Sequence, residues 1–345
     1  MKLLKKLLSS IVILFLVLTV FFSTLAVGLF VYGEVSGQQL IPEFHTVQDA
    51  KRWLKSVGES TNIPLLSSYL SSIKTSDTPS ADVTEQLQTY DSEFYPYFQM
   101  LNADQKIVYA QLVEAVEGCQ DSLTMSVYGL DYEAAEDVWE AVFYDHPELF
   151  WLEESASFHY YPNGGVTSID LHYNELADNL EYHKSLFDEA VNGLLGQAQQ
   201  YSSSYDKEMY LHNALVELCE YDLHASCSQS AYSALVNHSS VCAGYAKAYQ
   251  LLMMRCGIPC YYASGWSGEN HAWNITRIDD EFYNVDVTWD DGTHTFIFFN
   301  RTDADLAGTH QRMDLSLQLP ACQGELHHNT EPIPPIDINA LSSGS

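Results

Sequence analysis

Apolar residues recur at helical spacing along much of the chain after about residue 95. In residues 102–116 they return every three or four positions, and Asn102 followed by Gln105 forms the pattern of a capping box. Residues 135–143 carry a second apolar stripe, and the helix that it predicts ends at His146-Pro147. Two more helices are predicted over about 176–195 and 207–218. This part of the chain is therefore predicted to be mainly helical.

Shorter apolar runs bounded by turn residues predict strands. Residues 150–161 and 166–173 flank an Asn-Gly-Gly turn and should pair as a β-hairpin. Four further strands are expected over 260–265, 271–278, 281–289 and 295–300. The second and third of these are separated by an Asp-Asp pair, which suits a two-residue turn. Helices combined with antiparallel strands predict an α+β fold.

One helix is predicted to begin at or beside Cys242. Ser239 or Ser240 can cap its start, and Ser228 can cap a short helix just before it. The early turns of the Cys242 helix carry small residues, which permit close packing. Gly257 suits its C-terminal stop, because the Ile-Pro pair that follows cannot continue the helix.

The N-terminus has a different pattern. Three lysines precede a 27-residue uncharged and largely apolar span, residues 7–33. This span is long enough to cross a bilayer as a helix and exceeds the apolar core of a signal peptide. The lysines before it and Glu34 after it orient the start of the chain inside and the rest outside. We expect an uncleaved signal anchor, while Thr24-Leu25-Ala26 leaves a cleaved and secreted form as the alternative.

These patterns divide the chain into five parts. The stalk contains a linker-like stretch low in bulky apolar residues, and the Pro-rich C-terminus ends in Ser-Gly-Ser. The predicted parts are a signal anchor or transmembrane segment (1–36), a stalk with short helices (37–94), a mainly helical accessory region with a β-hairpin (95–204), the core with the Cys242 helix (205–320) and a disordered tail (321–345).

Composition narrows the classes of partner. The chain of 345 residues contains 46 acidic and 15 basic residues, a formal net charge of −31. Phosphate binding needs a basic surface, so nucleic acid is not an expected partner. Of the seven cysteines, six can pair and leave Cys242 as a free thiol, or all seven can remain reduced. The spacing of the cysteines does not decide between these alternatives.

Cys242, His271 and Asp286 follow one another in the order of a thiol nucleophile, its base and a residue that orients the base. A thiol at a helix N-terminus lies at the positive end of the helix dipole, which favours the thiolate. If the residues flanking the Asp-Asp turn pair with each other, His271 lies opposite Thr288. Asp286 is then the diagonal neighbour of His271 on the same face of the hairpin.

Other residues complete the predicted site. The oxyanion is expected to meet the backbone N–H of Cys242 and one further donor, for which Tyr232 and Gln229 are the candidates. Candidates for lining the substrate cleft are Tyr245, Trp273 and His310. No cysteine, histidine or acidic residues occur at zinc or EF-hand spacing, so neither a metal nor another cofactor is expected.

Three motifs resemble a known family. Residues 241–246 read Val-Cys-Ala-Gly-Tyr-Ala, residues 271–274 read His-Ala-Trp-Asn, and residues 283–291 read Tyr-Asn-Val-Asp-Val-Thr-Trp-Asp-Asp. In this order and at this spacing they resemble the transglutaminase-like superfamily, specifically its extracytoplasmic bacterial members. The resemblance covers about residues 207–291. It implies a papain-like α+β core, in which a helix bearing the thiol packs on an antiparallel sheet bearing the His and the Asp.

The resemblance also implies a function. It places Cys242, His271 and Asp286 in the catalytic triad of the family, which attacks a peptide or side-chain amide through a thioester. Water resolves the thioester in peptidases and amidases, and an amine resolves it in transglutaminases. The expected substrate is a peptide or protein at the cell envelope, with the enzyme held at the membrane by its N-terminal helix. The alternative is a non-catalytic surface module for binding or scaffolding that retains the triad.

Overall fold

The computed structural model describes residues 89–125, 130–161, 164–293 and 296–333. The chain divides into two compact units, residues 1–75 and 76–345, and the first unit lies outside the described residues. The predicted signal anchor and nearly all of the predicted stalk lie outside them as well. None of the helices that the structure describes is long and apolar enough to cross a membrane.

Three helices begin the described part of the chain. α5 (Pro96–Met100) leads to α6 (Ala103–Glu117), and α7 (Tyr132–Asp145) packs against both. The predicted capping box at the start of α6 is confirmed. The Asn102 side chain accepts a hydrogen bond from the backbone N–H of Gln105, and the Gln105 side chain accepts one from the backbone N–H of Asn102. α7 ends just before the His-Pro pair, as predicted.

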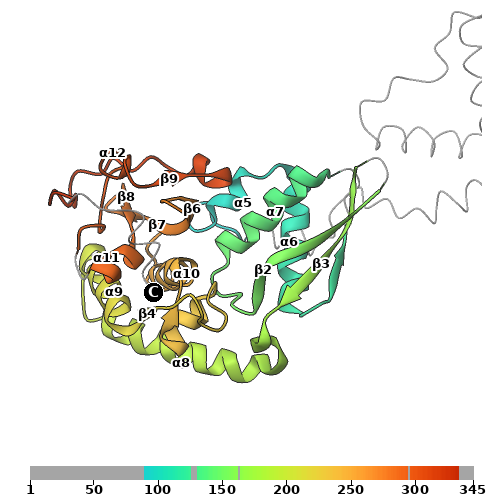
Figure 1. Cartoon of the computed structure of the whole chain (residues 1–345), viewed down its shortest axis with the longest axis horizontal. Helices are drawn as coiled ribbons and strands as arrows, with labels where there is room; N and C mark the ends of the chain where they lie inside the picture. The colour runs from blue at the N-terminus through green and yellow to red at the C-terminus, as the bar shows by residue number, and fades with distance from the viewer. Residues whose placement is uncertain (1–88, 126–129, 162–163, 294–295, 334–345) are drawn as a thin grey trace, which may run out of the picture. The chain divides into compact units, whose positions relative to one another are not determined.

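The predicted β-hairpin is present beside these helices (Figure 1). β2 (Leu152–Tyr160) and β3 (Val166–Tyr173) pair antiparallel. A third strand, β1 (Ser122–Thr124), pairs with the other edge of β3. It was not predicted because three residues are too few to show a periodic pattern. The Trp139 Nε1–H of α7 donates to the Glu154 carbonyl oxygen of β2, which ties the hairpin to the helices.

The next helices follow their predicted ranges closely. A 3-10 turn, η1 (Glu175–Asn179), leads into α8 (Leu180–Ala198), and α9 (Ser204–Leu218) follows. The Ser203 side chain accepts from the backbone N–H of Asp206 and caps α9. A short strand, β4 (Glu220–Tyr221), then begins the segment that leads to Cys242.

The segment before Cys242 differs from the prediction. In place of a helix capped by Ser228, a single π-helical turn, η2 (Ser233–Asn237), precedes β5 (Ser239–Ser240), which pairs in parallel with β4 (Glu220–Tyr221). The Ser240 hydroxyl donates to the Ser228 carbonyl oxygen instead of capping the next helix. Serine hydroxyls compete for such local backbone partners, which is why a capping pattern alone was misleading here.

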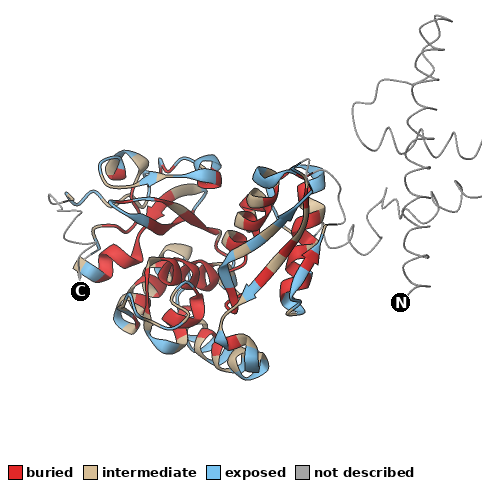
Figure 2. Cartoon of the chain, turned by 45° about the vertical axis from the view of Figure 1, so that its right-hand side comes forward, coloured by how far each residue is buried: buried red, intermediate tan, exposed pale blue. Residues whose placement is uncertain are grey.

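The helix that begins at Cys242, α10 (Cys242–Arg255), packs on an antiparallel sheet with the strand order β8-β7-β6-β9. The strands are β6 (Cys260–Trp266), β7 (Asn270–Ile278), β8 (Glu281–Val285) and β9 (Gln311–Arg312). α9 covers α10 on another side, and α10 is buried over most of its length (Figures 1 and 2). The predicted α+β arrangement of a thiol-bearing helix on an antiparallel sheet is confirmed.

Three predictions for the C-terminal part are wrong. The strand expected over 281–289 ends at residue 285, and α11 (Val287–Thr293) follows it. Residues 296–300 form turns rather than a strand, and two short helices come after them, α12 (Asp303–Leu306) and η3 (Asp314–Gln318). The described part of the predicted tail, residues 321–333, packs on the domain. The buried Arg301 guanidinium requires acceptors, and it finds them in the backbone oxygens of residues 329 and 331.

The predicted accessory region and the predicted core share one interior. A single cluster of buried apolar side chains extends from Tyr97 in α5 to Cys322 near the C-terminus. It includes residues of α6, α7 and the hairpin as well as residues of α10 and the four-stranded sheet. The first turns of α10 are therefore held by a large surrounding structure on several sides.

Candidate active site

Cys242 is partly exposed, although most of the helix that it begins is buried. It packs against a small buried cluster that includes Ala246 and Tyr262, and the Tyr144 ring stacks on Tyr262 with 4.9 Å between the ring centroids. In the part of the chain that the structure describes, no residue accepts a hydrogen bond from the backbone N–H of Cys242. This N–H and the positive end of the helix dipole are therefore available to a negatively charged group.

Contacts from two sides fix the first turns of α10. On one side, a Cβ atom on Gly244 would lie 1.9 Å from Ser240 Oγ and 2.7 Å from the Ser228 carbonyl oxygen, so only glycine permits this close approach. On the sheet side, Asn274 Nδ2 donates to the Ala246 carbonyl oxygen at 2.9 Å. The helix bearing the thiol is thus attached directly to the strand that bears the histidine.

His271 lies near the start of β7, and its Nε2 is 2.7 Å from Asp286 Oδ2. The predicted hairpin register is confirmed as far as Asn274, which pairs with Val285. The predicted pairing of His271 with Thr288 is wrong, because β8 ends at Val285 and Thr288 belongs to α11. Asp286 still meets His271, but from the first position after the strand.

Asp286 ends the strand because it caps the helix that follows. Its Oδ1 accepts from the backbone N–H of Trp289 at 3.0 Å, and its own backbone N–H donates to the Phe298 carbonyl oxygen. Aspartate is a preferred N-cap residue, and a bond to the N–H three residues later is typical of an N-cap. One carboxylate oxygen therefore starts α11 while the other holds His271.

The buried side chains of His271 and Asp286 stabilise each other's charges. Burial alone would lower the pKa of His271, but the Asp286 carboxylate and hydrogen bonds with Asp286 and Cys242 raise this pKa to about 10. Burial would raise the pKa of Asp286, yet His271 and His310 hold it well below its usual range. At neutral pH the pair is therefore imidazolium and carboxylate. Because Nε2 faces Asp286, Nδ1 is the ring nitrogen left for Cys242.

Residues 193–287, which contain Cys242, His271 and Asp286, match the model of the transglutaminase-like superfamily. This region is a transglutaminase-like domain. Among solved structures, the chain is similar to a TGase at 16% identity and a TM-score of 0.28, with 40% of this chain and 45% of that chain covered. It is also similar to a protein from Cytophaga hutchinsonii assigned as a cysteine protease, at 15% identity and a TM-score of 0.27, with 39% and 61% covered.

The chain thus spans less than two thirds of the length of either solved structure. Comparison with curated proteins gave no match.

His310 was predicted to line the cleft of this domain, and the structure gives it a more central position. Its Nε2 is 3.0 Å from Asp286 Oδ2, the same oxygen that His271 contacts. Its Nδ1 is 2.9 Å from Thr309 Oγ1, and its side chain is 2% exposed. His310 is therefore a buried side chain outside the matched residues 193–287, and together with Trp273 it lines a cavity of about 220 Å³. Its role in a substrate cleft stays a prediction.

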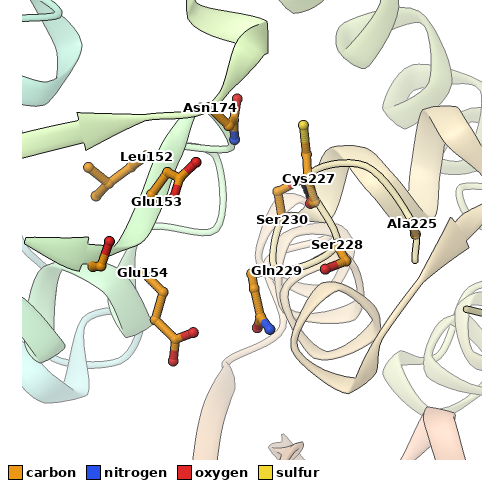
Figure 3. A pocket seen from close by; sticks show the side chains of 10 residues that line it. Leu152, Glu153, Glu154, Asn174, Ala225, Cys227, Ser228, Gln229 and Ser230 are labelled. Atoms are coloured by element: carbon orange, nitrogen blue, oxygen red, sulfur yellow. Dashed lines mark hydrogen bonds between the residues drawn. The ribbon is translucent and has the colours of Figure 1, made fainter. Parts of the chain in front are cut away.

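The two predicted side-chain donors for the oxyanion have different surroundings. The Tyr232 hydroxyl lies 2.9 Å from His183 Nδ1, and the Tyr232 ring packs with Phe150 in the interior, so this hydroxyl already has a partner. Gln229 projects into a cavity of about 340 Å³ between β2 and residues 225–230, where Glu153 and Glu154 form the opposite side (Figure 3). The backbone N–H of Cys242 remains the predicted donor that the geometry supports.

The other two cleft candidates are also interior residues. Tyr245 is fully buried, and its hydroxyl donates to Asp291 Oδ2 at 2.8 Å. Trp273 is 2% exposed and donates through Nε1 to Asn284 Oδ1 at 3.0 Å. Both belong to the motifs that resemble the family. Trp273 lines the cavity that His310 also lines, and the predicted cleft role of the two residues is untested.

His271, Asp286 and His310 are the three described residues with ligand atoms close enough to hold a metal ion, within 4.8 Å of one another. Their hydrogen bonds already explain this proximity, because an ionised Asp286 accepts hydrogen bonds from both imidazoles. All seven cysteines are free thiols. Burial raises the pKa of Cys227 to about 12 and also raises the pKa of Cys256.

Proposed function

We propose that the transglutaminase-like domain is a cysteine-dependent acyl-transfer enzyme that attacks an amide through a thioester. The observation that carries this proposal is the placement of the His271 ring. Asp286 fixes one of its nitrogens, and the other is left for Cys242 at the N-terminus of α10. Both the imidazolium and the helix dipole favour the thiolate form of Cys242.

In the first half of the proposed reaction, the Cys242 thiolate attacks the amide carbon and forms a C–S bond, and the carbonyl π electrons move to oxygen. The backbone N–H of Cys242 stabilises this oxyanion. When the oxyanion collapses, the C–N bond breaks, and His271 donates its proton to the departing amine. A thioester and a neutral imidazole remain.

In the second half, water or an amine gives a proton to His271 and attacks the thioester carbon. The C–S bond breaks, and the thiolate and the imidazolium return to their starting state. Asp286 keeps the proton of His271 Nε2 in place throughout, so that Nδ1 is the nitrogen that exchanges protons with the reactants. Water yields a carboxylic acid, and an amine yields a new amide.

The substrate class and the location of this activity are proposed from the sequence. The uncharged span 7–33, preceded by lysines, supports a membrane-anchored protein whose globular part acts on peptides or proteins outside the cytoplasm. Protease added to intact cells should then degrade the globular part. Its protection until the cells are broken would contradict this location.

The activity is tested by alkylation of the full chain with iodoacetamide between pH 5 and 9, followed by peptide mass mapping. We expect Cys242 to react fastest of the cysteines, because it is partly exposed and its sulfur lies beside an imidazolium. Cys227 and Cys256 serve as internal controls and should react only at higher pH, since burial raises their pKa values.

The Cys242→Ala variant completes the test. It should lose the fast-labelling peptide and any amidase, peptidase or amine-transfer activity found with peptide substrates. If Cys242 labels no faster than Cys227 and Cys256, the thiol is not activated, and a non-catalytic binding module becomes the better interpretation. Turnover by Cys242→Ala would also refute the proposed nucleophile.

A further inference from the structure

We propose that His310 is a positioning residue, which holds the Asp286 carboxylate in the orientation that His271 requires. This inference rests on the proposed function of Cys242 and His271. His310 follows α12, and its contact with Asp286 joins the segment after this helix to the residue between β8 and α11.

The carboxylate of Asp286 is fully buried and accepts three hydrogen bonds. Oδ1 accepts from the backbone N–H of Trp289, while Oδ2 accepts from Nε2 of both His271 and His310. Two donors on the same oxygen define where that oxygen lies. Without His310, the side chain could rotate about the Trp289 contact and change the angle at which Oδ2 meets His271.

The protonation state of His310 follows from its surroundings. The groups that face it are the Asp286 carboxylate, the His271 imidazolium and the Thr309 hydroxyl. Burial and the charge of His271 lower the pKa of His310 by more than the contact with the Asp286 carboxylate raises it. A neutral ring must keep its proton on Nε2 to donate to the carboxylate, which leaves Nδ1 as an acceptor. The one hydrogen of the Thr309 hydroxyl then points to Nδ1 at 2.9 Å rather than to the Leu306 carbonyl oxygen at 3.2 Å.

Aromatic packing holds the His310 ring in place. The centroid of the ring lies 4.7 Å from that of Trp289 and 5.1 Å from that of Trp273. The backbone N–H of His310 donates to the Leu306 carbonyl oxygen at 2.8 Å, which fixes its position relative to α12. A ring enclosed in this way has little freedom to leave Asp286, which is what positioning of a carboxylate needs.

Two conservative variants of the full chain distinguish the contact of His310 with Asp286 from its contact with Thr309. In His310→Gln, the side-chain amide nitrogen reaches the place of Nε2 and can still donate to Asp286. In His310→Asn, the shorter amide reaches only the place of Nδ1, so the contact with Thr309 is kept and the contact with Asp286 is lost. His328→Gln is the matched control, because His328 pairs with Asp305 at 2.7 Å outside the site.

The rate of Cys242 alkylation at pH 7 is measured for each protein, together with the downfield proton signal of His271 Nε2–H in the NMR spectrum. We expect His310→Asn to slow alkylation by about 10- to 100-fold, as for loss of one hydrogen bond to a charged group. The proton signal should shift or broaden in this variant. His310→Gln should keep most of the rate and of the signal, and His328→Gln should match the unmodified chain.

Equal behaviour of His310→Asn and the unmodified chain would refute the positioning role. An equal loss in His310→Asn and His310→Gln, accompanied by equal drops in the midpoint of thermal unfolding, would also refute it and indicate a packing role. If Cys242 in the unmodified chain is not fast-labelling, the proposed function fails instead. The NMR signal then decides the inference separately, because it reports the contact of His271 with Asp286 and needs no reaction.

Discussion

Asp286 is the residue on which most interactions of the site converge. Its carboxylate accepts from His271, from His310 and from the backbone N–H of Trp289. Asparagine at this position would keep one acceptor oxygen and replace the other with an N–H₂ donor. If the N–H₂ group takes the place of Oδ2, which faces both imidazoles, each ring has to give up its Nε2 proton. In His271 this proton would move to Nδ1, where it would prevent the ring from accepting a proton from a reactant. In the other orientation the N–H₂ group faces the backbone N–H of Trp289, which is also a donor.

We therefore expect Asp286→Asn to slow Cys242 alkylation at pH 7, and any turnover, by at least about 100-fold. The pKa of His271 should fall well below about 10, because the carboxylate that raises it is gone. Alkylation kinetics and an NMR titration of His271 measure the two effects. Asp290→Asn is the matched control, since Asp290 pairs with His212 at 3.0 Å in a second fully buried pair. An equal loss in both variants would contradict a specific role of Asp286.

The residues of the site differ in how far the sequence could predict them. Cys242, His271 and Asp286 each lie in a short motif whose chemistry and order are visible in the chain. The contact of His310 with Asp286 spans 24 positions and depends on the path of α11, α12 and the turns between them. Tyr232 has a hydroxyl near Cys242 in sequence, but its spatial partner, His183, comes from α8.

At the level of elements, the start of α10 depends on a glycine that packs against backbone. A Cβ atom at Gly244 would lie 2.7 Å from the Ser228 oxygen and 2.8 Å from the Ser230 oxygen. Backbone atoms cannot move aside as a flexible side chain can. We expect Gly244→Ala to lower the free energy of unfolding by about 1–3 kcal/mol and to slow Cys242 alkylation, because the helix must shift. Chemical denaturation and peptide mapping measure these effects.

Gly193→Ala in α8 is the matched control for this prediction. Gly193 also lies within a helix, but nothing lies within 4 Å of the place where its Cβ would be. Alanine there should stabilise the protein by about 0.5–1 kcal/mol through helix propensity alone. If Gly244→Ala behaves like Gly193→Ala, close packing of the segment before Cys242 on α10 is not what requires glycine.

The prediction of a strand over residues 281–289 failed at Asp286, whose side chain has two partners. Alternation of residues correctly predicted β7 and β8 and their register. The same alternation appeared to continue past Asp286, and it concealed an N-cap. Asp286 bonds forward to the backbone N–H of Trp289 and sideways to His271 at once. Periodicity describes only which face a residue occupies, so it could not show that the strand ends there.

For the whole molecule, hydrophobic periodicity was enough to predict the mainly helical accessory region and the α+β class. It could not show that the accessory region and the core share one buried cluster, since such contacts join residues far apart in the chain. Composition, in turn, wrongly predicted a disordered tail for residues 321–333, because their proline-rich sequence is typical of one. Their backbone oxygens satisfy the buried Arg301, a requirement that composition does not reveal.

Glu208 joins three parts of the molecule and is a test of its overall stability. This side chain of α9 is fully buried. It accepts from Thr276 Oγ1 of β7 at 2.7 Å and from Asn300 Nδ2 in the turn before α12 at 3.0 Å. Neither partner is charged, and burial raises the pKa of Glu208 to about 8. Glu208 is therefore mostly protonated in the folded protein at neutral pH but ionised in the unfolded chain.

A carboxyl group whose pKa is raised by folding stabilises the fold fully below its unfolded pKa of about 4.5. This contribution is lost progressively as the pH rises towards about 8, at about 1.4 kcal/mol per pH unit. Glu208→Gln, which is neutral at every pH, should therefore be more stable than the unmodified chain at pH 8–9 and similar to it at pH 5. Other titrating groups are common to both proteins and cancel in the difference.

Denaturant unfolding of both chains at several pH values between 5 and 9 measures this difference. Glu217→Gln on the same helix is the control, because Glu217 is exposed, and its stability curve should stay parallel to that of the unmodified chain. A parallel curve for Glu208→Gln as well would mean that Glu208 is ionised in the folded state. It would then need a cationic partner or water that neither Thr276 nor Asn300 supplies.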